Sequence, residues 1–120
     1  FLGIVEDMPS LLRAVDAVVM PVNSLYAKVD MPLVLLEAMA LETPVIVSDL
    51  GPLTELAGLG GGAMVVGQSD PSSCAQAMIE LGTDRSKIER MGRAAQSTIA
   101  LNFRPEDMVQ RYEAIYDELI

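Results

Sequence analysis

The stretch KVDMPLVLLEAMALETPVIVSD, residues 28–49, sets the pattern for the rest of the chain. It predicts a helix that opens near Pro32, a short break, and a buried strand over 44–47. The helix is apolar almost all the way round, which is typical of a helix buried on all sides. Glu37 is the only charged residue between Asp30 and Glu42. Because burial of an unpaired carboxylate is costly, Glu37 needs a partner, a ligand or access to solvent.

Length and composition predict one globular domain with a sizeable core. The chain has 120 residues, of which 51% are hydrophobic and 21% are charged. This balance excludes a disordered chain. The net charge of −9 disfavours nucleic acid and anionic lipid as partners. A phosphate ligand stays open, because backbone N–H groups at a helix start bind phosphates without basic side chains.

The residue types present limit the chemistry that this chain can perform alone. It has no His and a single Cys, Cys74, so it holds neither a His/Cys metal site nor a His-dependent catalytic triad. No apolar run approaches the roughly 20 residues of a membrane-spanning helix. The chain opens on Phe1 inside an apolar run, from which we expect a piece of a longer protein whose other residues supply further groups.

Short apolar runs alternate with helical segments along the chain. The runs 1–5, 17–20, 44–47 and 63–66 predict buried strands, with helices between them at about 8–14, 33–41 and 52–57. Three helices follow, opening after Asp70, Asp84 and Arg104. This order predicts an α/β fold with a Rossmann-like parallel sheet, helices on both faces and three final helices. Ligands of such sheets bind at the carboxyl ends of the strands, here the loops 6–8, 21–31, 48–52 and 67–70.

The predicted helix after Pro32 follows one of these loops, and its start is a suitable anion site. Glu37 lies about a turn and a half inside the helix, so its side chain points back toward that start. A diphosphate bound there would place an attached ribose near the carboxylate. Alternatively, Glu37 pairs with a Lys or Arg from elsewhere, or reaches solvent.

Residues 32–56, PLVLLEAMALETPVIVSDLGPLTEL, resemble the signature region of the retaining GT-B glycosyltransferases, specifically glycosyltransferase family 4, the group 1 type. FLGIVEDMPSLLRAVDAVVMP, residues 1–21, is similar to that family's strand-helix-strand before the donor site. The resemblance covers nearly the whole chain. It implies that residues 1–120 are most of the C-terminal, nucleotide-sugar-binding domain of a two-domain GT-B fold, truncated at its N-terminus.

The resemblance assigns roles residue by residue. Glu37 matches the second acid of the family's Glu-x7-Glu motif, which binds the donor ribose. The segment Met31, Pro32, Leu33 and Val34 matches the backbone that meets the donor diphosphate. Val5 matches a position that contacts the nucleobase through its main chain, and Glu55 matches an acid with a structural role.

The chain departs from the family pattern at the motif's first acid, which contacts the transferred sugar. The matching position, eight residues before Glu37, is Val29. Asp30 is adjacent and offers a possible sugar contact, whereas a role in capping the helix is equally compatible with the sequence. Lys28 is a candidate for offsetting the charge of the donor phosphates.

The resemblance implies the donor-binding part of a retaining hexosyltransferase of glycan biosynthesis. Its substrate would be a nucleoside-diphosphate sugar, with no metal and no other cofactor. Its partner would be its own N-terminal GT-B domain, in the cytoplasm or at the cytoplasmic membrane face, with membrane contact only through parts outside this chain. We expect the fragment alone to be inactive. Two alternatives stay open: a non-catalytic nucleotide-sugar-binding or assembly domain, and a nucleotide-sugar epimerase.

Overall fold

The computed structural model describes residues 1–26 and 30–120. The described residues form three strands, β1 (Val18–Met20), β2 (Val45–Ser48) and β3 (Ala63–Val66). The helices are α1 (Met8–Ala14), α2 (Leu33–Ala40), α3 (Gly51–Gly58), α4 (Pro71–Thr83), α5 (Arg85–Asn102) and α6 (Pro105–Leu119). The strands pair in parallel in the order β1-β2-β3, with Val18 opposite Val45 and Val45 opposite Ala63. The predicted Rossmann-like α/β class, ending in three helices, is confirmed.

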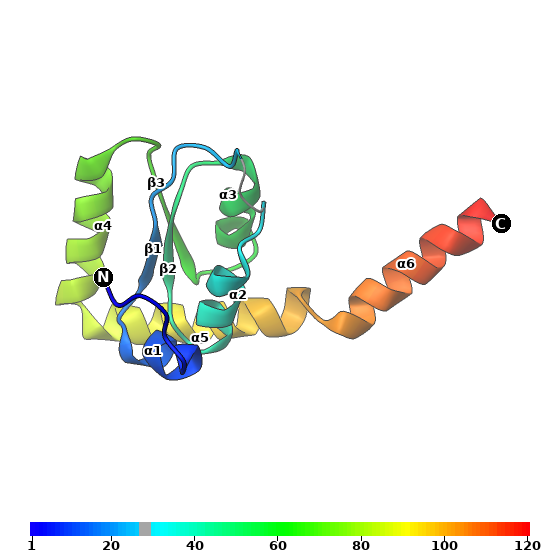
Figure 1. Ribbon diagram of the computed structural model, residues 1–120, viewed down its shortest axis with the longest axis horizontal. Coiled ribbons are helices and arrows are strands. Elements are labelled where there is room, and N and C mark those ends of the chain that lie inside the picture. The colour runs from blue at the N-terminus through cyan, green and yellow to red at the C-terminus, as the bar shows by residue number, and fades with distance from the viewer. Residues whose placement is uncertain (27–29) are drawn as a thin grey trace.

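Helices cover both faces of this sheet. Figure 1 shows α2 and α3 on one face and α4 on the other. The long helix α5 crosses the end of the sheet where the strands begin, and α6 projects away from the body. This projection lengthens the molecule to 54 Å, against 29 and 28 Å in the other two directions.

The central strand β2 divides the core into two clusters, one on each face of the sheet. All four of its residues are buried. Val45 and Val47 join the cluster that contains Leu35 of α2, whereas Ile46 joins the cluster that contains Leu81 of α4. Because successive side chains of a strand point to opposite faces, a continuous apolar run such as 45–47 suits a strand covered on both sides.

Aspartates begin three of the helices, α1, α4 and α5, and the sequence predicts the starts of α4 and α5 after Asp70 and Asp84. Each carboxylate accepts a hydrogen bond from the backbone N–H three residues later, with distances of 3.1, 3.0 and 2.9 Å for Asp7, Asp70 and Asp84. These bonds satisfy donors that the first turn of a helix otherwise leaves free. The Ser10 side chain and then its backbone N–H lower the pKa of the Asp7 carboxyl below its ordinary value, and the charge of Arg13 acts in the same direction.

Glycines let α5 pack unusually close to the rest of the domain. A Cβ built on Gly92 would overlap the carbonyl oxygen of Glu42, in the turn after α2. One built on Gly62 would overlap the backbone of Ala95 in α5. The carbonyl of that same Gly62 accepts a hydrogen bond from the Val45 N–H at 3.1 Å, so the close contact lies against the entry of β2 into the sheet.

The predicted strand over residues 1–5 is wrong. These residues form no strand and are largely exposed; Phe1, Leu2 and Ile4 have large exposed fractions, and Gly3 has a φ of +68°. A strand needs a neighbour to pair with, and no segment of the described chain pairs with this one. An apolar run predicts burial, but it does not supply the neighbouring strand.

The predicted burial of the central helix on all sides is also wrong. Leu35, Ala38 and Met39 of α2 are fully buried, but Leu33 is 69% exposed and Glu37 is exposed too. The sheet and α5 cover only part of the helix. The final helix α6 is exposed as well: its apolar side chains Met108, Tyr112, Ile115 and Leu119, which are spaced as one helical stripe, are open to solvent.

Candidate functional site: the start of α2

The loops that follow the three strands gather at the end of the molecule opposite α5 (Figure 1). Three hydrogen bonds tie the strand exits together. The buried Ser48 hydroxyl donates to the carbonyl of Met20 at 3.4 Å, and the N–H of Asp49 donates to Val66 at 2.8 Å. The side-chain amide of Gln68 donates to the carbonyl of Asp49. The exits of β1, β2 and β3 therefore hold fixed positions relative to one another.

In the first turn of α2, two backbone N–H groups have no acceptor among the residues that the structure describes. The residue that precedes the helix is Pro32, which is buried and has no side-chain hydrogen bond with which to cap it. The N–H of Leu35 donates to the carbonyl of Pro32 at 3.1 Å, but no described residue accepts a hydrogen bond from the amides of Leu33 or Val34. Free amides and the positive end of the helix dipole together attract an anion.

Glu37 lies one turn further along the same face of α2. Leu33 and Glu37 are four residues apart, so their side chains share one face, and both are exposed. The ion pairs among the described residues are Arg85–Asp16, Arg85–Glu89 and Lys87–Glu80, and none includes Glu37. The carboxylate has no ion-pair partner in the described chain and is exposed to solvent. It therefore does not carry the cost of a buried charge that the sequence alone suggests.

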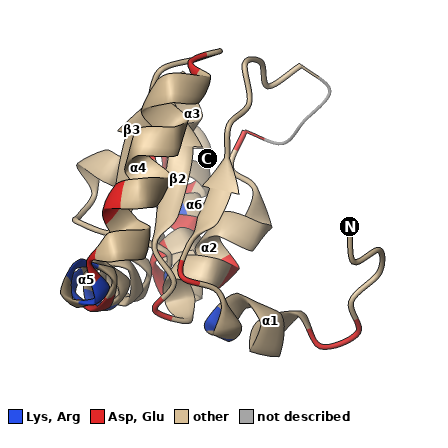
Figure 2. Ribbon diagram, turned by 90° about the vertical axis from the view of Figure 1, so that its left-hand side faces the viewer, with Lys and Arg blue, Asp and Glu red and all other residues tan. Residues whose placement is uncertain are grey.

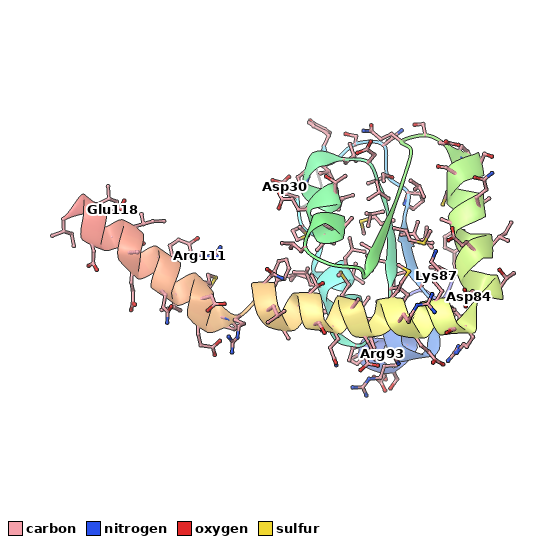
Figure 3. The ribbon with its side chains drawn as sticks, turned by 180° about the vertical axis from the view of Figure 1, so that it is seen from behind. Asp30, Asp84, Lys87, Arg93, Arg111 and Glu118 are labelled. Atoms are coloured by element: carbon pink, nitrogen blue, oxygen red, sulfur yellow. The ribbon has the colours of Figure 1, made fainter. Side chains whose placement is uncertain are left out.

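The other residues predicted for the donor site do not all lie near the start of α2. Met31 is half-buried and leads directly into α2. Asp30 is exposed and makes no capping hydrogen bond to the helix; Figure 3 shows it in the half of the molecule away from α5. Val5 is half-buried in the segment that leads into α1, at the end where the strands begin, and not beside the strand exits. Lys28 and Val29 lie outside the described residues.

Sequence reasoning missed the two residues that fix the strand exits, Ser48 and Gln68. Ser48 carried a weak signal, because a hydroxyl at the end of an apolar run must find a hydrogen-bond partner once it is buried. For Gln68, a polar residue in a loop, the sequence held no signal. Among the residues that the structure describes, no three His, Cys, Asp or Glu side chains come together in a way that suits a metal ion. None of the helices described is both long and apolar enough to cross a bilayer.

Comparison with known proteins places this arrangement in a family. A profile described as "Glycosyl transferases group 1" matches residues 1–84, which contain the strand exits and all of α2. A curated relative, N-acetyl-alpha-D-glucosaminyl L-malate synthase of Bacillus anthracis, is 31% identical over all 120 residues. The chain spans 30% of the length of that relative. By the match over most of its length, the chain belongs to the group 1 glycosyl transferases.

Proposed function

We propose that the chain is the donor-binding part of a retaining GT-B glycosyltransferase, corresponding to most of its C-terminal domain. It binds a nucleoside-diphosphate sugar, from which the whole protein transfers the sugar to an acceptor with retention of configuration. The observation that carries the proposal is the open start of α2, where the amides of Leu33 and Val34 and the carboxylate of Glu37, one turn away on the same face, have no partner among the described residues.

The chemistry of the donor matches these groups. Backbone amides and the helix dipole bind the diphosphate and stabilise its charge as it leaves, which is an electrostatic contribution to catalysis. The Glu37 carboxylate accepts hydrogen bonds from the two adjacent ribose hydroxyls. Hydrogen bonds to a charged group contribute about 1.5–3 kcal/mol each. Asp30 or Lys28 contacts the sugar or the phosphates, and no metal ion is needed for these contacts.

The remaining groups come from outside this chain. We propose that an N-terminal GT-B domain supplies the acceptor site, and that the exposed apolar stripe of α6 packs against it. The chain alone then binds donor without transferring sugar. The location is the cytoplasm or the cytoplasmic face of the membrane. The name of the Bacillus anthracis relative suggests an N-acetyl-α-D-glucosaminyl donor and L-malate as the first pair to assay.

Replacement of Glu37 tests the assignment. In the whole protein, Glu37→Ala is expected to weaken the binding of UDP, GDP or ADP, whichever the wild type prefers, by about 10- to 100-fold, because one or two hydrogen bonds to a carboxylate are lost. Isothermal titration calorimetry measures the affinity. The matched control is Glu80→Ala, which removes an exposed helical glutamate on the other face of the sheet. Equal affinities in the two variants would remove Glu37 from the site.

A second candidate function is a non-catalytic nucleotide-sugar-binding domain, favoured by Val29 at the position of the family's first acid. The two candidates differ in turnover. A donor panel incubated with the whole protein, with and without acceptor, yields free nucleoside diphosphate if the protein is a transferase. Binding of donor without release of nucleoside diphosphate across the panel would establish the second candidate instead.

A further inference from the structure

A polar cavity lies beyond the C-terminal end of α2, at the end of the domain where the strands begin. It has a volume of about 400 Å³ and lies between the end of α1, the turn after α2 and the exposed side of α5. Three of its lining residues are arginines from two different helices, Arg13 of α1 and Arg85 and Arg93 of α5. Figure 3 shows Arg93 on the side of α5 that faces α1. The cavity therefore collects three of the eight basic residues of a chain whose net charge is −9.

The acidic residues that line the cavity form salt bridges with only one of these arginines, Arg85. Arg85 pairs with Asp16 at 3.1 Å and with Glu89 at 3.6 Å, so both carboxylates are engaged by the same guanidinium. A guanidinium carries five N–H donors, which leaves Arg85 with further donors for a ligand. The two pairs also restrain the Arg85 side chain at the wall of the cavity.

Arg13 and Arg93 are not neutralised in this way. No described carboxylate lies within salt-bridge distance of either, although Glu42 lines the same cavity. Arg13, in the last turn of α1, complements the negative end of that helix. Arg93 has no equivalent role, because it lies in the middle of α5 and makes no hydrogen bond to a described residue.

We propose that this cavity binds a small soluble anion through a phosphoryl or carboxylate group held by Arg13, Arg85 and Arg93. Guanidinium groups match the planar, bidentate geometry of both kinds of oxygen anion. Figure 2 shows that Lys and Arg concentrate on α5, with a further basic turn at the end of α1. The three arginines balance the three carboxylates that line the same cavity, Asp16, Glu42 and Glu89, in a chain that is otherwise strongly acidic. The site is separate from the start of α2 and needs none of the donor-binding residues.

Inorganic phosphate is the probe, added to the chain at constant ionic strength with chloride as the balancing ion. Amide chemical shifts in NMR spectra report the binding. The double variant Arg13→Gln/Arg93→Gln is expected to weaken phosphate binding by about tenfold or more, because each lost guanidinium removes charged hydrogen bonds. The matched control is Arg90→Gln, which removes an arginine of α5 whose Nη1 bonds the Ser86 hydroxyl at 3.0 Å and which does not line the cavity.

The expected result is a set of shifts confined to residues around 13–16, 42–43 and 85–96, kept in Arg90→Gln and lost in the double variant. If Arg90→Gln loses half as much binding free energy as the double variant, which removes twice the charge, binding follows net charge alone and the proposal is overturned. The absence of saturable shifts in the wild type would also overturn it. A second measurement separates a lipid headgroup from a free anion. Sedimentation with phosphatidylcholine vesicles that contain phosphatidic acid, but no response to inorganic phosphate, would assign the arginines to a membrane surface and overturn the soluble ligand.

Discussion

Glu37 and the two free amides of α2 are useful to a ligand because nothing in the described chain competes for them. A carboxylate that was already paired, or a helix start that was already capped, would have to lose those contacts before a donor could bind. The open arrangement therefore suits the proposed donor, which carries a negative diphosphate and neighbouring hydroxyl donors.

The buried hydroxyls at the two ends of β2 have a different role, which is to fix the strand. The Thr43 hydroxyl donates to the carbonyl of Leu12 at 2.7 Å, across 31 positions of sequence and inside the core. At the other end Ser48 reaches the exit of β1. These bonds hold α1 and β1 in register with β2, and so they fix the point at which the chain leaves β1.

The substitution Thr43→Val tests the role of this hydroxyl, because it replaces the hydroxyl with a methyl group and changes little else. Valine keeps the volume but leaves the buried carbonyl of Leu12 without its donor, so the free energy of unfolding is expected to fall by about 1–3 kcal/mol. Urea denaturation followed by circular dichroism measures it. The control is Thr54→Val, whose hydroxyl bonds Gly51 at an exposed site, where a change within about 0.5 kcal/mol is expected. Similar losses in both variants would contradict the role given to Thr43.

At the scale of the helices, α5 packs close to the rest of the domain because two glycines at the contact have no side chains. The close approach of Gly92 to the turn after α2, and of Gly62 to α5, leaves no room for a Cβ. The apolar face of α5 then reaches the core through Ile88, Met91 and Ala95. Close packing of a helix against backbone leaves little room for relaxation, so added volume must move the helix itself.

The substitution Gly92→Ala is therefore expected to destabilise the domain by about 1–3 kcal/mol, although alanine is the better helix former. Gly82→Ala is the matched comparison, because Gly82 also lies in a helix but its Cβ would meet open space. There the free energy of unfolding is expected to stay unchanged or to rise by up to about 1 kcal/mol. A stabilised Gly92→Ala variant would show that α5 does not pack as closely as described.

Local signals were sufficient to predict most elements. The apolar runs over 44–47 and 63–66 are strands because each is short, continuous and bounded by turn residues. Asp70 and Asp84 predict the starts of their helices because each carboxylate accepts a hydrogen bond from a backbone N–H only three residues later in the sequence. The failures at residues 1–5 and on the outer side of α2 share one cause. Burial depends on a covering partner, and an apolar residue does not specify where that partner is.

The positions of some candidate site residues could be predicted from local patterns as well. The helix start after Pro32 and the position of Glu37 one turn further follow from helical periodicity, and both are observed. The ties made by Ser48 and Gln68 join segments that are far apart in sequence, so no local pattern contains them. Periodicity likewise gave no indication that Arg13 and Arg93 line one cavity, because α1 and α5 meet only through the fold.

At the scale of the whole molecule, α6 is an appendage of the folded body. All of its residues except Asp107 are exposed, and Figure 1 shows it leaving the domain after residues 103–104. Its stripe of Met108, Tyr112, Ile115 and Leu119 is an unusual amount of apolar surface to leave in water. An exposed stripe contributes little to the stability of the domain that carries it, and it is available for the proposed contact with an N-terminal domain.

Deletion of residues 105–120 is accordingly expected to change the free energy of unfolding of the domain by no more than about 1 kcal/mol, since little apolar area of the body is uncovered. A second truncation that also removes 85–102 is the control. It takes Ile88, Met91 and Ala95 out of the core and is expected to abolish cooperative unfolding. Loss of cooperativity in the shorter deletion would mean that α6 is part of the folding unit.

NMR titration of the chain with UDP, GDP and ADP tests most directly whether the start of α2 binds the donor. The amide resonances of Leu33 and Val34 are expected to show the largest shifts with the preferred nucleotide, because their free N–H groups would then donate to its phosphates. In Glu37→Ala the same resonances are expected to shift only at about 10- to 100-fold higher concentration. Saturable nucleotide binding that leaves Leu33 and Val34 unshifted, or that is indifferent to Glu37→Ala, would contradict a donor site at α2.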